Sequence, residues 1–152
     1  SGPFPTELFD ERGKRLQKIG NEIGATTGRV RRCGWFDLVA AKYSAEINGL
    51  THIALTKLDI LDYFKTIKVC THYVQNGQKT SKMSKVLNNL NEVQPVYKNF
   101  KGWDKKVSEA KTFNDFPKGA QEYIEFLEKN LNIPISIISV GPKRNQIINI
   151  EN

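Results

Sequence analysis

Three arginines stand in a short glycine-rich stretch whose residue types could bind an anion. Residues 24–35 read Gly-Ala-Thr-Thr-Gly-Arg-Val-Arg-Arg-Cys-Gly-Trp. Glycine lets the backbone bend and approach a ligand closely, and threonine hydroxyls both donate and accept hydrogen bonds. A guanidinium matches a carboxylate or a phosphate with two parallel hydrogen bonds. The stretch therefore predicts a loop that holds a small anion, and a solvated basic turn is the alternative.

A second candidate directly follows a short β-type run, residues 51–56. Lys57 and Asp59 are separated there by one residue. A carboxylate can accept hydrogen bonds from guanine N1–H and N2–H₂ together, which adenine cannot supply, and a lysine stem can pack along the base. The carboxyl end of a strand is also where α/β sheets bind ligands. The pattern is typical of a guanine-reading site, although spacing alone favours a surface Lys–Asp pair that caps the next helical turn.

A third candidate is the strand-like run that ends in Ser139-Val140-Gly141-Pro142. Its amides and carbonyls could complete a base pocket, while by itself it is better explained as a plain turn that ends a strand. Other chemistries are not indicated. His52 and His72 lack partners at metal-ligand spacing, and the sequence contains no glycine-rich phosphate loop with a trailing Lys-Ser or Lys-Thr.

Composition limits the class of protein and of partner. The 152 residues suffice for one domain with a sizeable core, and the net charge of +7 indicates an anionic partner: a nucleotide, a carboxylate metabolite, a nucleic acid or a membrane surface. Cys33 and Cys70 suit reduced, intracellular thiols. Without an apolar run of transmembrane length, we expect a soluble cytosolic protein. The first residue is Ser1 rather than Met, so we expect either a processed chain or an excised piece of a larger protein.

Strand-type and helix-type patterns alternate along the chain, which predicts an α/β fold. The expected helices cover residues 11–23, ended by Gly24, then 35–47 and a third that starts at Pro117. The expected extended segments are 51–56, 66–75, 93–103, 135–140 and 147–150. Asn76-Gly77 predicts a tight hairpin turn after residue 75. The polar residues 80–91 are interpreted as a surface excursion.

Six motifs stand in an order and spacing that resemble the C-terminal part of the adenylosuccinate synthetase family. They occupy residues 2–7, 20–22, 24–29, 32–37, 55–62 and 138–142. The resemblance covers nearly the whole chain. It implies the C-terminal portion of a P-loop-NTPase-like mixed α/β sheet, with flanking helices and a β-hairpin excursion, as one domain piece over residues 1–152. Val30 departs from the family, where this position of the loop is often arginine.

The resemblance also implies a reaction and a set of binding residues. The family is a ligase of purine (AMP) biosynthesis that joins IMP to L-aspartate with GTP hydrolysis and Mg²⁺, through a 6-phosphoryl-IMP intermediate. By position, the aspartate-binding loop falls on Thr26, Thr27, Arg29 and Arg31, and Arg29 also falls on a position that reaches the IMP ribose. The guanine-binding positions fall on Lys57, Asp59, Ser139, Gly141 and Pro142.

The phosphate loop, the catalytic Asp and His and the Mg²⁺ ligand of the family lie upstream of anything in this sequence. The resemblance therefore implies a fragment without catalytic residues or metal ligands, which is inactive alone and belongs to a cytoplasmic homodimer that engages neither nucleic acid nor membrane. A stand-alone basic nucleotide- or RNA-binding domain is the alternative. The charge supports it, but no RNA-recognition motif appears.

Overall fold

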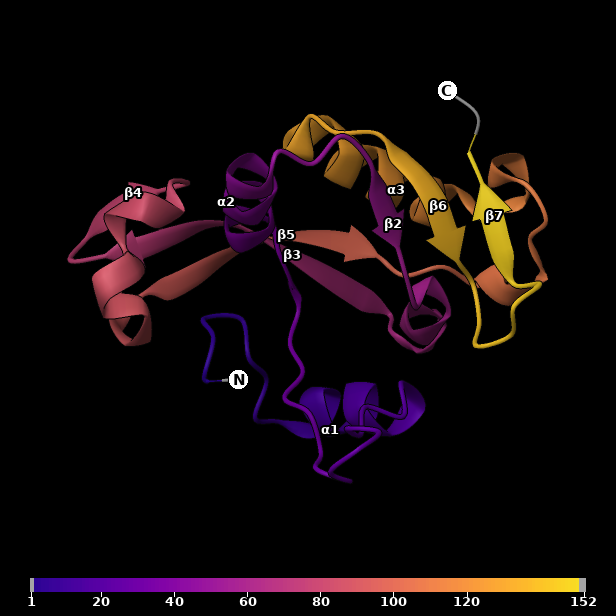
Figure 1. The fold of residues 1–152 in the computed structure, drawn as a ribbon, viewed down its shortest axis with the longest axis horizontal. Helices are drawn as coiled ribbons and strands as arrows, with labels where there is room; N and C mark the ends of the chain where they lie inside the picture. Colours follow the sequence, from indigo (N-terminus) through magenta and orange to yellow (C-terminus); the bar gives the residue numbers. More distant parts are fainter. Residues whose placement is uncertain (1, 151–152) are drawn as a thin grey trace. The chain divides into compact units, whose positions relative to one another are not determined.

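The computed structural model describes residues 2–150, whose ribbon is drawn in Figure 1. The chain divides into two compact units. The first unit comprises residues 1–43 and 68–98, and the second comprises residues 44–67 and 99–152. The division falls within α2 (Leu38–Asn48), β3 (Thr66–Gln75) and β5 (Gln94–Lys101). Each unit is described separately below.

The sheet of the first unit is organised by β3, which pairs with three other strands. The short β1 (Phe36–Asp37) runs parallel to it, β4 (Gln78–Thr80) pairs antiparallel, and β5 also pairs with it. Asn76 and Gly77 join β3 to β4 with φ values of 50° and 76°. Both values are positive, as a two-residue type I′ turn requires. The predicted strand over residues 66–75 and the predicted hairpin are confirmed.

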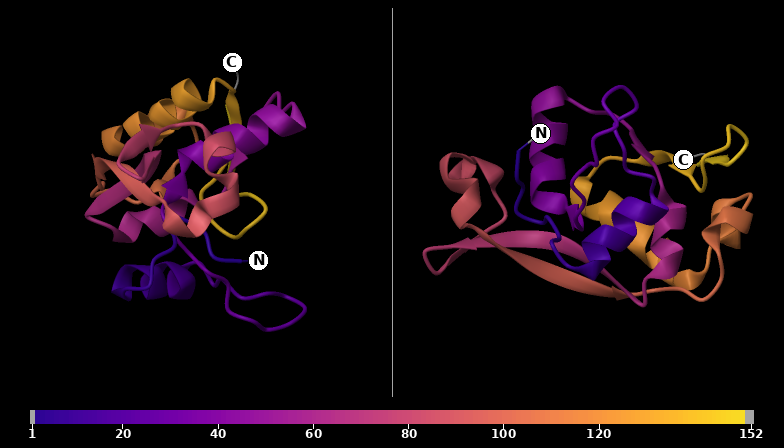
Figure 2. Two further views of the ribbon diagram at one scale, coloured as in Figure 1. Left: turned by 90° about the vertical axis from the view of Figure 1, so that its left-hand side faces the viewer. Right: turned by 90° about the horizontal axis from the view of Figure 1, so that it is seen from below.

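The residues after the hairpin contribute to the core, which the sequence analysis did not anticipate. Two 3₁₀ segments follow β4, η2 (Met83–Lys85) and η3 (Leu87–Glu92), as the right-hand view of Figure 2 also shows. Val86 lies between them at 2% exposure and belongs to a cluster with other buried side chains, namely Val39, Cys70, Tyr73 and Val93. The interpretation of residues 80–91 as a purely surface excursion is therefore wrong, because one of its aliphatic side chains packs under the sheet.

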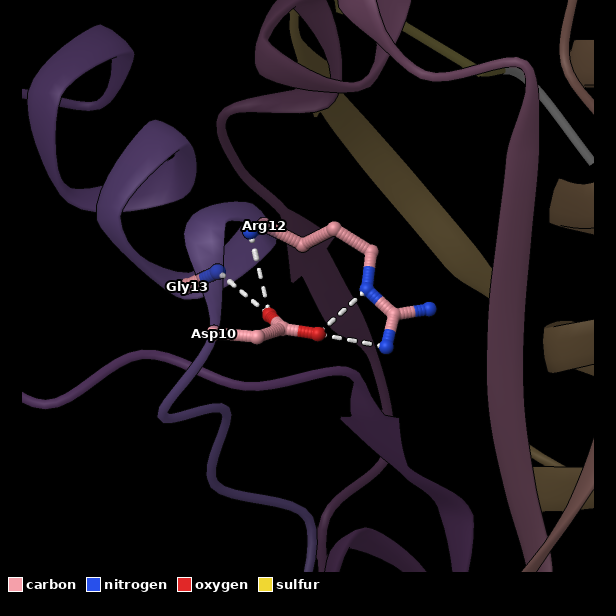
Figure 3. Close-up of polar contacts among 3 residues, drawn as sticks. All are labelled: Asp10, Arg12 and Gly13. Atoms are coloured by element: carbon pink, nitrogen blue, oxygen red, sulfur yellow. Dashed lines mark hydrogen bonds and ion pairs between the residues drawn. The ribbon is translucent and has the colours of Figure 1, made fainter.

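Helix α1 (Glu11–Ile19) is shorter than predicted. It begins after Asp10, whose carboxylate accepts hydrogen bonds from Arg12 N at 3.0 Å and Gly13 N at 3.3 Å, as drawn in Figure 3. Asp10 is thus the N-cap of the helix. The helix ends at Gly20, and Asn21 has a φ of 46°, so the chain has left the helix before Gly24. The prediction of a helix to residue 23 is wrong.

Helix α2 also begins later than the predicted residue 35. Phe36 and Asp37 form β1 instead, and the Asp37 carboxylate accepts a hydrogen bond from Ala40 N at 3.1 Å. A side chain that satisfies a free amide of the first turn marks the start of a helix. The predicted end is confirmed, because the helix stops at Asn48 and Gly49 has a φ of 60°.

The second unit contains a three-stranded sheet with the order β2-β6-β7, formed by β2 (Ile53–Leu55), β6 (Ile135–Ser139) and β7 (Ile147–Asn149). β2 runs parallel to β6, and β7 runs antiparallel to it. Helix α3 (Lys118–Leu131) starts after Pro117, as predicted, and lies behind β6 in Figure 1. Its buried stripe is Ala120, Tyr123, Ile124, Leu127 and Leu131. The α/β fold with a mixed sheet, helices and a hairpin is confirmed.

Short 3₁₀ segments complete the second unit: η1 (Leu58–Tyr63), η4 (Val107–Glu109) and η5 (Phe113–Asp115). The Asp62 carboxylate joins η1 to η4, because it accepts from Trp103 Nε1 at 2.5 Å and from Val107 N at 3.2 Å. Both tryptophans are buried, and both cysteines are free thiols. Among the described residues, no helix is long and apolar enough to span a membrane.

Candidate functional site

The parallel pairing of β2 with β6 brings two of the sequence candidates to one edge of the second unit. Leu55, the last residue of β2, is paired with Ile138, the penultimate residue of β6. The chain leaves β2 into Lys57 and Asp59, and it leaves β6 through Ser139 into Gly141 and Pro142. We call these five residues together the strand-end site. The carboxyl ends of parallel strands are where sheets of this kind bind ligands.

Lys57 has an unusual backbone conformation within the strand-end site. Its φ of 60° and ψ of 35° are left-handed, a region that a lysine enters only at a free-energy cost. The next residue, Leu58, is 1% exposed and anchors the start of η1 in the core. Lys57 is exposed on one side of this anchor, and Asp59 is half-buried on the other. Two polar side chains are thus held on either side of one buried residue.

The Asp59 carboxylate has a second acid nearby. Burial raises the pKa of Asp62, the Trp103 and Val107 hydrogen bonds counteract this, and the charge of Asp59 raises it further. Among residues 2–150, no side chain or backbone amide donates a hydrogen bond to Asp59. Its two oxygens are therefore available to accept from a ligand.

The turn after β6 is fixed by its own hydrogen bonds. Ser139 Oγ donates to Gly141 O at 3.1 Å, and Val140 N donates to Gln146 O at 3.0 Å. A Cβ on Gly141 would lie 2.4 Å from the side-chain amide of Gln146, so the end of that flexible side chain would have to move to admit another residue. Pro142 is exposed. The turn presents a defined backbone surface beside Lys57 and Asp59.

The arginine loop, residues 24–32, is a separate candidate in the first unit. Ile23 and Val30 form an antiparallel bridge at its base, and Gly24 N donates to Arg29 O at 2.8 Å. Gly28 has a φ of 63°, which glycine adopts readily, and its amide donates to Gly24 O at 2.8 Å. The loop is thus closed on itself by backbone hydrogen bonds, and its side chains are exposed.

The arginine loop borders a hollow of about 220 Å³ that is open to solvent. Three of the four residues predicted for aspartate binding line this hollow: Thr27, Arg29 and Arg31. The rest of the lining is Gly24, Val30 and Arg32. Thr26 is exposed and does not line this hollow. Arg32 is one of the three arginines of the predicted anion-binding loop, but it was outside the set that the resemblance implies for aspartate binding.

Two carboxylates hold arginines of the loop. Arg31 Nη1 donates to Glu22 Oε2 at 3.3 Å, and Arg32 Nη1 donates to Glu7 Oε2 at 3.1 Å. Gln17 Nε2 additionally donates to the Arg31 carbonyl at 2.9 Å. Three arginines therefore line the hollow, and the charges of two of them, Arg31 and Arg32, are partly offset by glutamates. This arrangement can bind a carboxylate or a phosphate.

A partly buried polar pair links β1, which follows the arginine loop, to β3, and it was not anticipated. Tyr73 Oη donates to Asp37 Oδ2 at 2.5 Å. Burial raises the pKa of Asp37, and the hydrogen bonds from Tyr73 and the α2 amides counteract this. Burial and the neighbouring Asp37 raise the pKa of the Cys70 thiol to about 12. The hydrogen bond between Tyr73 and Asp37 joins β3 to β1, the strand that follows the loop.

Comparison with known proteins identifies the family. A family model described as adenylosuccinate synthetase matches residues 1–148. The chain belongs to the adenylosuccinate synthetase family. The adenylosuccinate synthetase of Thermoanaerobacter sp. (strain X514) is 52% identical over 147 residues, which are 97% of this chain and 34% of that protein. The adenylosuccinate synthetase of Geotalea daltonii is 49% identical over 152 residues, which are 100% of this chain and 35% of that protein.

A solved structure agrees with the sequence relatives. The structure of a fully ligated adenylosuccinate synthetase from Plasmodium falciparum superposes with a TM-score of 0.87 at 36% identity, and the match covers 99% of this chain and 37% of that one. The chain thus spans about a third of the length of the synthetases it matches. The resemblance noted in the sequence is confirmed at the level of the family and the fold.

Proposed function

We propose that this chain is the part of an adenylosuccinate synthetase that binds L-aspartate and recognises the guanine base of GTP. The whole enzyme would join IMP to L-aspartate, with GTP converted to GDP, in purine biosynthesis. Membership of the family supports the reaction. By the family resemblance, we also propose that the whole enzyme is a cytoplasmic homodimer.

The observation that carries the proposal is the parallel pairing of β2 with β6. It supports a guanine pocket because it gathers four chemically suited groups at one strand end: the Lys57 stem, the Asp59 carboxylate, Ser139 and the Gly141 backbone. In the proposed complex, both Asp59 oxygens accept from guanine N1–H and N2–H₂. The Lys57 stem covers one face of the base, and the turn at residues 139–142 borders its edge.

The arginine loop supports the aspartate assignment. Arg29 and Arg31 line the hollow beside the Thr27 hydroxyl. Guanidiniums can bind a carboxylate through two parallel hydrogen bonds. Thr26, although it does not line the hollow, lies at the exposed tip of the loop, and we assign it to the rim of the bound ligand. Arg29 carries the additional proposed contact with the IMP ribose.

By the family resemblance, we propose that the Mg²⁺ ligand of the whole enzyme lies outside this chain. Among residues 2–150, no group of three or more His, Cys, Asp and Glu side chains could hold a metal ion. We therefore assign no metal ligand among these residues. The proposed contribution of this chain is substrate binding and orientation, and we propose that it does not catalyse the reaction alone.

A comparison of guanine with xanthine as the bound base tests the guanine assignment of the strand-end site. An Asp59→Asn variant replaces one acceptor by a donor, which suits the second carbonyl of xanthine better than the N2 amino group of guanine. Binding of GDP and of xanthosine diphosphate to the 152-residue chain should be compared by calorimetry. The wild type should prefer GDP and the variant xanthosine diphosphate, each by roughly tenfold or more.

The matched control is Asp104→Asn, at an exposed aspartate of the same unit, which should leave the preference for GDP unchanged. An unchanged preference in Asp59→Asn would remove the guanine assignment. A separate turnover assay of the chain with IMP, aspartate, GTP and Mg²⁺ should yield no adenylosuccinate. Product formation would contradict the proposal that the chain is inactive alone.

A further inference from the structure

The carboxyl-terminal arm of the arginine loop is fastened to a segment near the start of the chain, residues 4–8. Leu8 N donates to Cys33 O at 2.9 Å, and Trp35 N donates to Thr6 O at 3.3 Å. An isolated antiparallel bridge joins Glu7 to Gly34. The approach requires glycine at residue 34, because a Cβ there would lie 2.1 Å from Thr6 O. The place of the loop's last arginine is therefore set by a segment remote in sequence.

The side chain of Glu7 extends this attachment to the guanidinium of Arg32. The Glu7 side chain is only 8% exposed, whereas that of Arg32 is 42% exposed. A carboxylate that is largely removed from water needs a charged or hydrogen-bonding partner. Arg32 Nη1 supplies it at 3.1 Å. Among residues 2–150, Arg32 Nε and Nη2 make no hydrogen bond, so Glu7 orients the guanidinium and leaves two of its nitrogens available.

The hollow contains the same arrangement twice. Arg31 is tied through Nη1 to Glu22, just as Arg32 is tied to Glu7, while Arg29 lines the hollow without a carboxylate partner among the described residues. Two of the three guanidiniums are thus paired with glutamates, and the lining of the hollow keeps a positive charge that favours a carboxylate ligand.

We propose that Arg32 is a further specificity-determining residue of the arginine loop and that Glu7 is its positioning residue. The inference rests on the proposed aspartate-binding function of the loop and deepens it. Arg29 and Arg31 take one carboxylate of the ligand, and the open nitrogens of Arg32 take the other. The loop thereby selects a dicarboxylate over a monocarboxylate, because only a dicarboxylate satisfies all three guanidiniums.

A titration of the 152-residue chain with succinate, and with acetate as the monocarboxylate, tests the selection. Arginine Nε–Hε signals are followed by NMR in the isotope-labelled protein. The decisive variants are Arg32→Lys, which keeps the charge beside Glu7 but loses the planar fork, and a charge exchange that combines Glu7→Arg with Arg32→Glu. The matched control is Arg12→Lys, because Arg12 is also paired with an acid, Asp10, but lies outside the hollow.

The wild type and Arg12→Lys should bind succinate more tightly than acetate, and Arg32→Lys should weaken succinate binding about tenfold or more with little change for acetate. The charge exchange keeps an ion pair between residues 7 and 32, so its melting temperature should be close to that of the wild type. It should nevertheless bind succinate more weakly than the wild type does. If the ion pair were purely structural, the charge exchange would keep both the melting temperature and the succinate binding of the wild type.

Three results would overturn the inference, and they are distinguishable. If Arg32→Lys binds succinate like the wild type, or if the charge exchange restores binding, Arg32 is structural only and the aspartate assignment of the loop stands. If the wild type shows no preference for succinate, the loop assignment fails and the inference fails with it. If the exchanged chain does not fold, Arg32→Lys decides the question alone. The guanine assignment is unaffected in each case, because Asp59→Asn tests it independently.

Discussion

The arginine loop and the strand-end site hold their functional side chains by different means. At the strand-end site, β2 and β6 stay paired as far as Leu55 and Ile138, after a register shift between Ile53 and Ala54, so the backbone itself positions Lys57, Asp59 and Ser139. The arginine loop is closed by isolated bridges, and its guanidiniums are oriented by glutamates 9 and 25 residues away. One site therefore depends on packing and the other on charge. Three predictions test this difference, and a fourth, on pH, concerns a property in which the two units should behave alike.

The largest effect is expected from Leu58→Ala in the strand-end site. Leu58 is 1% exposed and lies between Lys57 and Asp59, so truncation leaves a cavity beneath both. We expect the free energy of unfolding to fall by about 2–5 kcal/mol and GDP binding to fall with it. Urea denaturation measures the first and calorimetry the second. Leu50→Ala, at a residue that is 45% exposed in the same unit, is the control and should change little.

A smaller effect is expected from Gly34→Ala beneath the arginine loop. The new methyl group would collide with the Thr6 carbonyl, a backbone atom that cannot move without separating the two paired segments. We expect a loss of about 1–3 kcal/mol in unfolding free energy and faster hydrogen exchange at the Leu8 and Trp35 amides. Gly2→Ala meets nothing within 4 Å and is the neutral reference. Unchanged exchange at both amides would show that the loop does not depend on this attachment.

Salt should distinguish the two sites directly. Raising the NaCl concentration from about 0.05 to about 0.5 M shortens the screening length severalfold, so succinate binding at the exposed arginines should weaken by several-fold. The preference of the strand-end site for GDP over xanthosine diphosphate should stay constant, because it depends on hydrogen-bond direction rather than net charge. Parallel titrations at both concentrations measure this. An equal loss at both sites would contradict the comparison.

The smallest effect concerns pH, and here the two units should behave alike. Burial raises the pKa of Asp37 in the first unit and of Asp62 in the second. The folded chain then keeps these protons at a pH where the unfolded chain has lost them. Their contribution to stability is complete below the ordinary aspartate pKa and is lost as the pH rises through the raised values.

Urea midpoints measured from about pH 3 to about pH 7 should show this loss, and Asp37→Asn should reduce it. For Asp10, stability should change with pH in the opposite direction. Its hydrogen bond with Arg12 holds its pKa below the ordinary value, so its contribution is present at neutral pH and is lost on acidification. An Asp10→Asn variant should therefore flatten the acidic side of the profile instead. The same profile in all three proteins would show that neither acid is coupled to folding.

The strand-end site could largely be foreseen from local sequence. Apolar runs that end in Lys57-Leu58-Asp59 and Ser139-Val140-Gly141 predicted strands with polar residues at their carboxyl ends, and both strands are present. The alternation of residues 66–75 and the Asn76-Gly77 turn likewise gave β3 and its hairpin with the correct bounds. These elements were predictable because side-chain period and turn chemistry act over a few residues.

Features that depend on distant partners were not foreseen. Nothing local marks Glu7 as the partner of Arg32, since 25 residues separate them. The early end of α1 was missed because Gly20 and Asn21 stop the helix while Ile23 continues its apolar spacing. The burial of Val86 had a weak signal, because Met83, Val86 and Leu90 are spaced by three and four residues within a polar segment.

The left-handed backbone of Lys57 places two demands on one residue. The turn into η1 would be formed at lower conformational cost by glycine or asparagine, which enter this region readily. The proposed cover for the base, in contrast, needs a long aliphatic stem with a charged end. Thermodynamic stability and nucleotide affinity therefore place opposite requirements on residue 57. A substitution that relaxes the backbone there would give a more stable protein that binds guanine less tightly.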